Sequence, residues 1–198
     1  RRFDPPYLKV RSLLESGDFG SPLFIRAATR NLHSKGITNE GLYTNIAVHD
    51  FDIWQWMFNA EWVSVNSHYP ISSSLSPDGL IDPLVFTAKL SNGVMLVADI
   101  VANSNYGYDV RTELVCEKGS IEIGIFGDVY TRANGVAQAI QGGEMATDWM
   151  PRFEDAYINE LEAWTQFLRE GKINNDLATA EDGLKATQAC ALGLASIK

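Results

Sequence analysis

One stretch of seventeen residues carries most of the structural information in this sequence: Gly41-Leu42-Tyr43-Thr44-Asn45-Ile46-Ala47-Val48-His49-Asp50-Phe51-Asp52-Ile53-Trp54-Gln55-Trp56-Met57. Apolar side chains recur in it at helical spacing, through Ile46, Ile53 and Met57. This spacing is typical of a helix that buries one face. The pattern predicts a helix that begins near Thr44 or Asn45 and packs on a core.

A second stripe of the same helix is polar. Asn45, His49, Asp52 and Trp56 stand at offsets of 0, 4, 7 and 11, and residues three and four apart are neighbours on a helix surface. The stripe therefore offers an amide, an imidazole, a carboxylate and an indole. Such a set can bind a polyhydroxylated molecule, and an imidazole can transfer a proton near neutral pH.

Composition is that of an ordinary globular protein. The 198 residues are 45% hydrophobic and 21% charged, with a net charge of -9. An acidic surface repels phosphate backbones, so we expect no nucleic acid partner. No apolar run has the length of a membrane span. Cys116 and Cys190 lie in apolar runs and are expected to be buried free thiols, which favours a cytoplasmic location.

Both ends of the sequence look cut. The chain starts with Arg1-Arg2, without a methionine, and stops at Ile197-Lys198 inside a helical pattern. We expect a fragment of a longer polypeptide, and an intact protein that has lost a tag is the alternative.

The first third of the chain predicts two helices around a strand. Asp4 can cap a helix that starts at Pro5-Pro6, and Gly17 can end it. Residues 22–29 form the predicted strand, and 31–41 form an exposed loop before the second helix.

The middle of the chain predicts strands joined by hairpins. The predicted strands are 62–69, the pair 84–90 and 94–100 around Asn92-Gly93, the pair 110–116 and 120–125 around Gly119, and the pair 129–132 and 136–140 around Asn134-Gly135. Helices follow at 152–171 and from a capping-box-like Thr179-Ala180-Glu181-Asp182.

These elements predict one α+β domain over residues 1–198, with an open, mostly antiparallel sheet and helices packed on one face. The other face must be solvated or paired, and its apolar content favours pairing with a second subunit in a homo-oligomer.

Several nucleotide and catalytic motifs are absent from the sequence. No two glycines are separated by a single residue, so there is no Rossmann phosphate loop. His33, His49 and His68 lack the spacing of metal ligands, and we expect no metal site. The His49 and Asp52 pair alone keeps a metal-dependent sugar isomerase or lyase open as a weak alternative.

Several segments, in order, resemble the C-terminal domain of the glucose-fructose oxidoreductase / inositol dehydrogenase / rhizopine catabolism (Gfo/Idh/MocA) family. The matching segments are Arg1-Arg2-Phe3-Asp4-Pro5, Asn45-x-x-x-His49-Asp50-x-Asp52, Leu90-Ser91-Asn92-Gly93, the hairpin Glu113 to Ile121, Arg152-Phe153 with Ala156-Tyr157 and Glu160-Leu161, and Glu181-Asp182-Gly183. The resemblance spans nearly the whole chain and implies the C-terminal half of a two-domain enzyme whose N-terminal Rossmann domain is missing here.

The resemblance also implies a function for the parent protein, an NAD(P)-dependent oxidation of a sugar or cyclitol hydroxyl. His49 occupies the family's proton-transfer position. The residue four before it is usually Asp in the inositol enzymes, whereas this chain has Asn45. The family's catalytic lysine and its NAD or NADP site belong to the N-terminal domain. We therefore expect this chain alone to bind no dinucleotide well and to be inactive.

Each candidate site residue has a structural alternative. His49, the expected acid/base, could be a structural histidine, and Asn45 could bind a hydroxyl or cap the helix. Asp52 could orient the imidazole and raise its pKa, or be solvated. Tyr157 could form a site wall or pack in the core, and Arg152 could hold a substrate group or form a surface salt bridge. Trp54 and Trp56 are expected to pack rather than bind ligand.

Two functional hypotheses remain from different classes. The first is the substrate-binding and oligomerisation domain of a dehydrogenase that acts on a small polyhydroxylated substrate. The second is a non-catalytic, stand-alone binding or dimerisation module, which would account for Asn45 and for the missing Rossmann half.

Overall fold

The strands form one open sheet, in the order β2-β3-β4-β1-β5-β6-β7-β8. The computed structural model describes residues 1–124, 127–133, 136–140, 146 and 148–197. The strands are β1 (Pro22–Arg30), β2 (Trp62–His68), β3 (Leu84–Leu90), β4 (Met95–Val101), β5 (Asp109–Cys116), β6 (Gly119–Ile123), β7 (Val129–Ala133) and β8 (Val136–Ile140).

Pairing in the sheet is mostly antiparallel, as predicted. Among the described strands, only β1 and β4 pair in parallel, because the chain leaves β1 through helices and two further strands before β4 returns beside it. The hairpins β3–β4, β5–β6 and β7–β8 are all present. Gly93 turns the first of them with a φ of +95°. The predicted turn at Asn134-Gly135 and residue 125, the predicted end of β6, lie outside the described residues.

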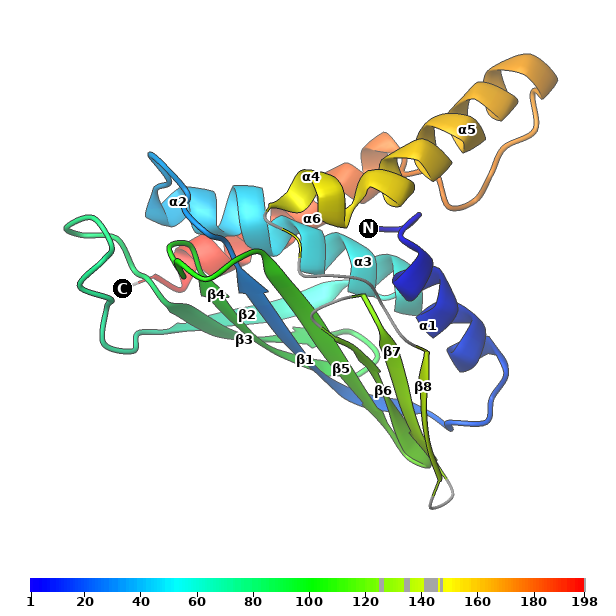
Figure 1. The fold of residues 1–198 in the computed structure, drawn as a ribbon, viewed down its shortest axis with the longest axis horizontal. Coiled ribbons are helices and arrows are strands. Elements are labelled where there is room, and N and C mark those ends of the chain that lie inside the picture. Colours follow the sequence, from blue (N-terminus) through cyan, green and yellow to red (C-terminus); the bar gives the residue numbers. More distant parts are fainter. Residues whose placement is uncertain (125–126, 134–135, 141–145, 147, 198) are drawn as a thin grey trace.

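Helices cover one face of the sheet, which confirms the α+β prediction (Figure 1). They are α1 (Pro5–Glu15), α2 (Asn39–Gly41), the π-helix η1 (Leu42–Ala47), α3 (Val48–Phe58), α4 (Trp149–Arg152), α5 (Glu154–Glu170) and α6 (Ala180–Ala195). The core lies between this face and the helices. Side chains of β1 alternate between the covered face and the open face, with Ile25 and Ala27 buried and Arg26 exposed.

The polar-striped helix starts earlier than predicted. Thr38 is the N-cap and accepts a hydrogen bond from the Gly41 amide at 3.0 Å. The helix then runs without interruption through α2, η1 and α3 to Asn59, whose left-handed φ of 46° ends it. The sequence carried no signal for η1, which adds a residue per turn around Asn45 and is a type of segment common at functional sites.

The predicted cap of the first helix is wrong, and that of the last helix is confirmed. Asp4 precedes α1 but makes no side-chain capping bond, because its carboxylate pairs with Arg152 instead. At α6 the predicted capping box is present. The Thr179 amide donates to Asp182 at 2.8 Å, and the Asp182 amide donates to the Thr179 hydroxyl at 3.2 Å.

Helix α6 crosses η1 in close contact, at Gly193 and Tyr43. Tyr43 is fully buried, stacks on Phe51 and contacts Phe86. Gly193 of α6 lies directly on the Tyr43 ring. Cys190, one turn earlier, donates to the Tyr43 carbonyl at 3.3 Å. Both cysteines are buried and free, as predicted, and burial raises their pKa values to about 11.

The helix predicted at 152–171 is confirmed as α5, and a separate short helix, α4, precedes it. Asp148 caps the short α4 by accepting from the Met150 amide, and the chain bends at Phe153 before α5 begins. Only Ala156 of α5 is buried, and Figure 1 shows the rest of this helix extending away from the sheet. The start of α5 packs through Ala156, beside Phe153, on Tyr108 and Val110 at the start of β5, and it lines the same cavity as the polar-striped helix.

Candidate functional site

An open cavity of about 480 Å³ lies where the N-terminal segment, the end of β1, the η1–α3 junction and the start of α5 meet. Its lining residues come from all of these elements. They are Arg1, Arg2, Phe3, Thr29, Asn31, Asn45, Ile46, His49, Asp52, Tyr108, Trp149, Phe153, Ala156, Tyr157, Glu160, Asp176 and Ala178. The cavity is a mixture of amide, imidazole, charged and aromatic groups, as binding sites for small polar molecules are.

The polar stripe of the helix forms one wall of this cavity. Asn45, His49 and Asp52 all line it. Asn45 is exposed within η1 and does not cap the helix, because Thr38 does. Its amide is thus free to donate to and accept from a bound hydroxyl.

His49 is a neutral imidazole at physiological pH. Solvent reaches its ring through the cavity, while protein surrounds it on its other sides. The protein that encloses the ring and the positive charge of the Arg1 guanidinium lower the pKa of His49 to about 3. The shift is opposite to the one expected from a partnership with Asp52. No group among the described residues hydrogen-bonds the imidazole, so its nitrogens are available to a ligand.

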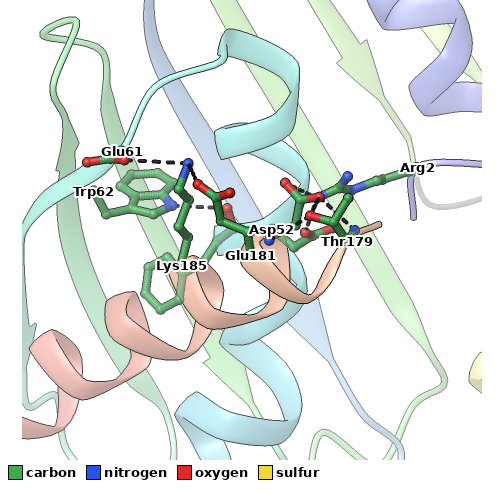
Figure 2. A network of polar contacts seen from close by, with 9 residues as sticks. Arg2, Asp52, Glu61, Trp62, Thr179, Glu181 and Lys185 are labelled. Carbon is green, nitrogen blue, oxygen red and sulfur yellow. Dashed lines mark hydrogen bonds and ion pairs between the residues drawn. The ribbon is translucent and has the colours of Figure 1, made fainter. Parts of the chain in front are cut away.

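Asp52 is engaged by Arg2 instead. Arg2 donates from Nε and Nη2 to the two carboxylate oxygens of Asp52, at 3.0 and 2.6 Å, and its Nη2 lies 3.4 Å from Asp182 of the α6 capping box. Figure 2 shows this network, in which Arg2 links α3 to the start of α6. The carboxylate thus fixes the cavity wall and does not orient His49.

Arg1 occupies the floor of the cavity through a second pair. Its guanidinium forms an ion pair with Asp50, and both side chains are almost fully buried. The charge of Asp50 raises the pKa of Arg1, so Arg1 stays protonated. Burial raises the pKa of Asp50, although the charge of Arg1 acts in the opposite direction. The pair therefore places a fixed positive charge beside His49.

Tyr157 lines the cavity, whereas Arg152 does not. Tyr157 lines the cavity, is half exposed and packs edge-on against Trp149, with ring centroids 5.9 Å apart. Arg152 is not among the lining residues. It donates from Nη1 and Nη2 to the two carboxylate oxygens of Asp4, each at 3.0 Å, in a largely buried pair. The structure thus places Arg152 in the support of the cavity, where it ties α4 to the N-terminal segment.

Sequence reasoning missed the contribution of β1. Thr29 and Asn31 line the cavity from the end of this strand. The Thr29 hydroxyl is buried and has no hydrogen-bond partner among the described residues. The period-two alternation of β1 does place Thr29 on the covered face with Ile25 and Ala27, and this was the available signal.

The described part of the chain contains neither a cluster of metal ligands nor a membrane-spanning helix. No group of three or more histidine, cysteine, aspartate or glutamate side chains is placed to hold a metal ion. No helix there has the length and apolar character needed to cross a membrane.

The fold and the cavity define a class of domain: an open-sheet α+β domain that presents a polar, partly aromatic cavity at the helix-covered side. The chain belongs to the GFO/IDH/MocA family, because residues 7–122 match the model of that family's C-terminal domain.

Known relatives include inositol dehydrogenases. Inositol 2-dehydrogenase 4 of Saccharopolyspora erythraea is 36% identical over 197 residues, which cover 99% of this chain and 56% of that protein. Inositol 2-dehydrogenase of Corynebacterium glutamicum is 34% identical over 202 residues, covering 100% of this chain and 57% of that protein. The chain therefore spans little more than half the length of these relatives.

A solved structure agrees with this grouping. The myo-inositol dehydrogenase from Lactobacillus casei, crystallised with NAD(H) and myo-inositol, superposes with a TM-score of 0.85 at 26% identity. The match covers 99% of this chain and 57% of that one.

Proposed function

We propose that this chain is the substrate-binding half of an NAD(P)-dependent oxidoreductase that oxidises a hydroxyl of a cyclitol or sugar, with inositol as the first candidate. The observation that carries the proposal is the open cavity in which the Asn45 amide and the neutral His49 imidazole share one wall. The inositol dehydrogenases among the relatives support the choice of substrate class.

The cavity residues suit this chemistry. The amides of Asn45 and Asn31 can donate to and accept from neighbouring hydroxyls. The neutral His49 can accept a hydrogen bond, and then a proton, from the hydroxyl that is oxidised. The Arg1 guanidinium lines the same cavity, so its charge favours negative charge that develops on that oxygen and opposes protonation of His49. Tyr157 and Trp149 offer apolar ring surfaces to the carbon skeleton.

The dinucleotide would be held by the rest of the parent protein. When bound, NAD or NADP accepts the hydride from the substrate carbon. This chain has no glycine-rich phosphate loop, so its residues do not fit the pyrophosphate, and we expect the chain alone to be inactive.

Enzyme assays on the parent protein test the proposal. We expect dinucleotide reduction with myo-inositol or a related polyol, and we expect His49→Ala to lower turnover by about 10²-fold or more, as for loss of a general base. His68→Ala is the matched control, because His68 is exposed on β2 and is outside the cavity lining. A parent that neither binds dinucleotide nor oxidises a polyol refutes the proposal.

The stand-alone binding module remains the competing function. Intact-mass analysis of the native protein separates the two, because a natural product of 198 residues would favour the module. A longer product that contains a dinucleotide-binding half would favour the enzyme.

The parent is also proposed to be a cytoplasmic homo-oligomer. Val63, Met95 and Val97 are exposed on strands of the sheet, and this apolar surface suits pairing with a second copy. The buried free thiols fit a reducing compartment. A monomer in sedimentation at micromolar concentrations contradicts the oligomer, and recovery in a secreted fraction contradicts the location.

A further inference from the structure

Helix α5 carries an apolar stripe that stays exposed to solvent in the described part of the chain. Tyr157, Leu161, Trp164 and Leu168 stand at offsets of 0, 4, 7 and 11 and therefore share one side of the helix. They are exposed by 49%, 60%, 51% and 61%. These four residues are called the α5 stripe below.

The α5 stripe exposes more apolar surface than is usual for a helix in water. Large apolar side chains at helical spacing normally pack on a core, and a contiguous exposed patch of them marks an interaction site. The helix is attached to the domain mainly at its start, where Ala156 is buried and the Asn159 amide donates to the Phe3 carbonyl at 3.2 Å. Beyond this point it extends away from the sheet (Figure 1).

The stripe is continuous with the candidate site. Tyr157 is its first residue and also lines the cavity. A hydride passes directly between carbons in contact, so a dinucleotide-binding half must reach the cavity mouth. A domain seated at the mouth meets the start of α5, and the rest of the stripe leads outward from there.

We propose that the α5 stripe is the docking surface for the dinucleotide-binding half of the parent polypeptide. This inference rests on the proposed function. The chain accounts for 56% of the length of its relative from Saccharopolyspora erythraea, which leaves enough polypeptide for a second domain. Interfaces between domains of one chain are of moderate size, about 600–1,500 Å², and a row of four large side chains can form the apolar centre of one.

The charges of α5 define the rim of the partner surface. The helix has one basic residue, Arg169, and its acidic residues are Glu154, Asp155, Glu160, Glu162 and Glu170. We therefore expect the docking surface of the other half to have an apolar centre with lysine or arginine around it.

Thiol labelling of the parent protein tests the inference. Leu161→Cys places a thiol in the stripe, and Gln166→Cys places one on an exposed polar side of the same helix as the matched control. The native Cys116 and Cys190 are buried and give a low background. We expect a maleimide to label Leu161→Cys about 10-fold more slowly than Gln166→Cys, because a docked thiol reacts only when the interface opens. Trp164→Cys repeats the measurement at a second stripe position.

Equal labelling rates at 161, 164 and 166 overturn the inference. Protection of 161 and 164 that disappears on dilution also overturns it, because a second copy of the chain would then be the occupant. The labelling is independent of turnover. A parent that fails to oxidise polyols but protects the stripe at all concentrations refutes the proposed reaction and leaves the docking surface intact.

Discussion

Gly193 lies where α6 crosses the ring of Tyr43, and a methyl group at this position has no room. A Cβ added to Gly193 would stand 2.2 Å from Tyr43 Cε1 and 2.6 Å from Cδ1. Carbon atoms in good contact are about 3.5–4.0 Å apart, so the ring and the helix would have to separate by at least about 1.3 Å. The ring cannot turn away cheaply, because it stacks on Phe51 and its hydroxyl bonds Ser67 at 2.6 Å.

A second glycine of the same helix provides a reference for the free-energy cost of Gly193→Ala. Gly183 has no atom within 4 Å of an added Cβ, so Gly183→Ala should stabilise the protein by up to about 1 kcal/mol through helix propensity. Gly193→Ala gains a similar propensity but adds an overpacking cost of about 1–3 kcal/mol. The confined Tyr43 ring places this cost near the upper end. We therefore expect the two variants to differ by about 3 kcal/mol, or roughly 6–12 °C in Tm.

Equilibrium unfolding in urea, followed by far-UV circular dichroism, measures this difference. The slope of unfolding free energy against urea should stay the same in both variants, because the change is one of packing. If Gly193→Ala and Gly183→Ala unfold at the same midpoint, α6 does not sit on Tyr43 as described, and the packing that supports the cavity wall is wrong.

Two further predictions concern charged groups. Arg152→Met leaves Asp4 buried without its partner and should cost about 3–5 kcal/mol in unfolding free energy. A variant of unchanged stability whose only defect is a higher KM would show instead that Arg152 binds the substrate. His49 should remain neutral from pH 8 to pH 5 in an NMR titration. Its pKa in the folded protein is about 3, below the usual value of about 6.5, so His49 is protonated first in the unfolded chain. The contribution of His49 to the free energy of unfolding is therefore present above pH 6.5 and is lost as the pH falls from 6.5 to 3. A titration midpoint near 6.5 would contradict the placement of Arg1 beside the ring.

Local patterns in the sequence were sufficient for most of the fold. Apolar spacing placed Ile46 and Ile53 in the core, and Asn92-Gly93 placed a hairpin. Thr179 and Asp182 placed the start of the last helix. Each of these signals depends on residues a few positions apart, whose geometry is fixed by the backbone repeat of a helix or strand.

The start of the polar-striped helix was predicted too late. Thr38 caps it six residues before Thr44, and the intervening η1 segment has no sequence signature comparable to a capping box. Side-chain packing against the sheet, rather than propensity, holds this segment, since Leu42, Tyr43, Ile46 and Ala47 are all buried.

The sequence by itself determined that one helix presents Asn45, His49 and Asp52 on one side, because the helical repeat alone brings residues three and four apart together. Only the tertiary structure decided how these groups are used. Arg2 pairs with Asp52, and Asp4 pairs with Arg152. Burial and the nearby Arg1 lower the pKa of His49. Each of these partners is distant in sequence. Such partners are chosen by which segments the packed core brings into contact, and charges interact through space and not along the chain.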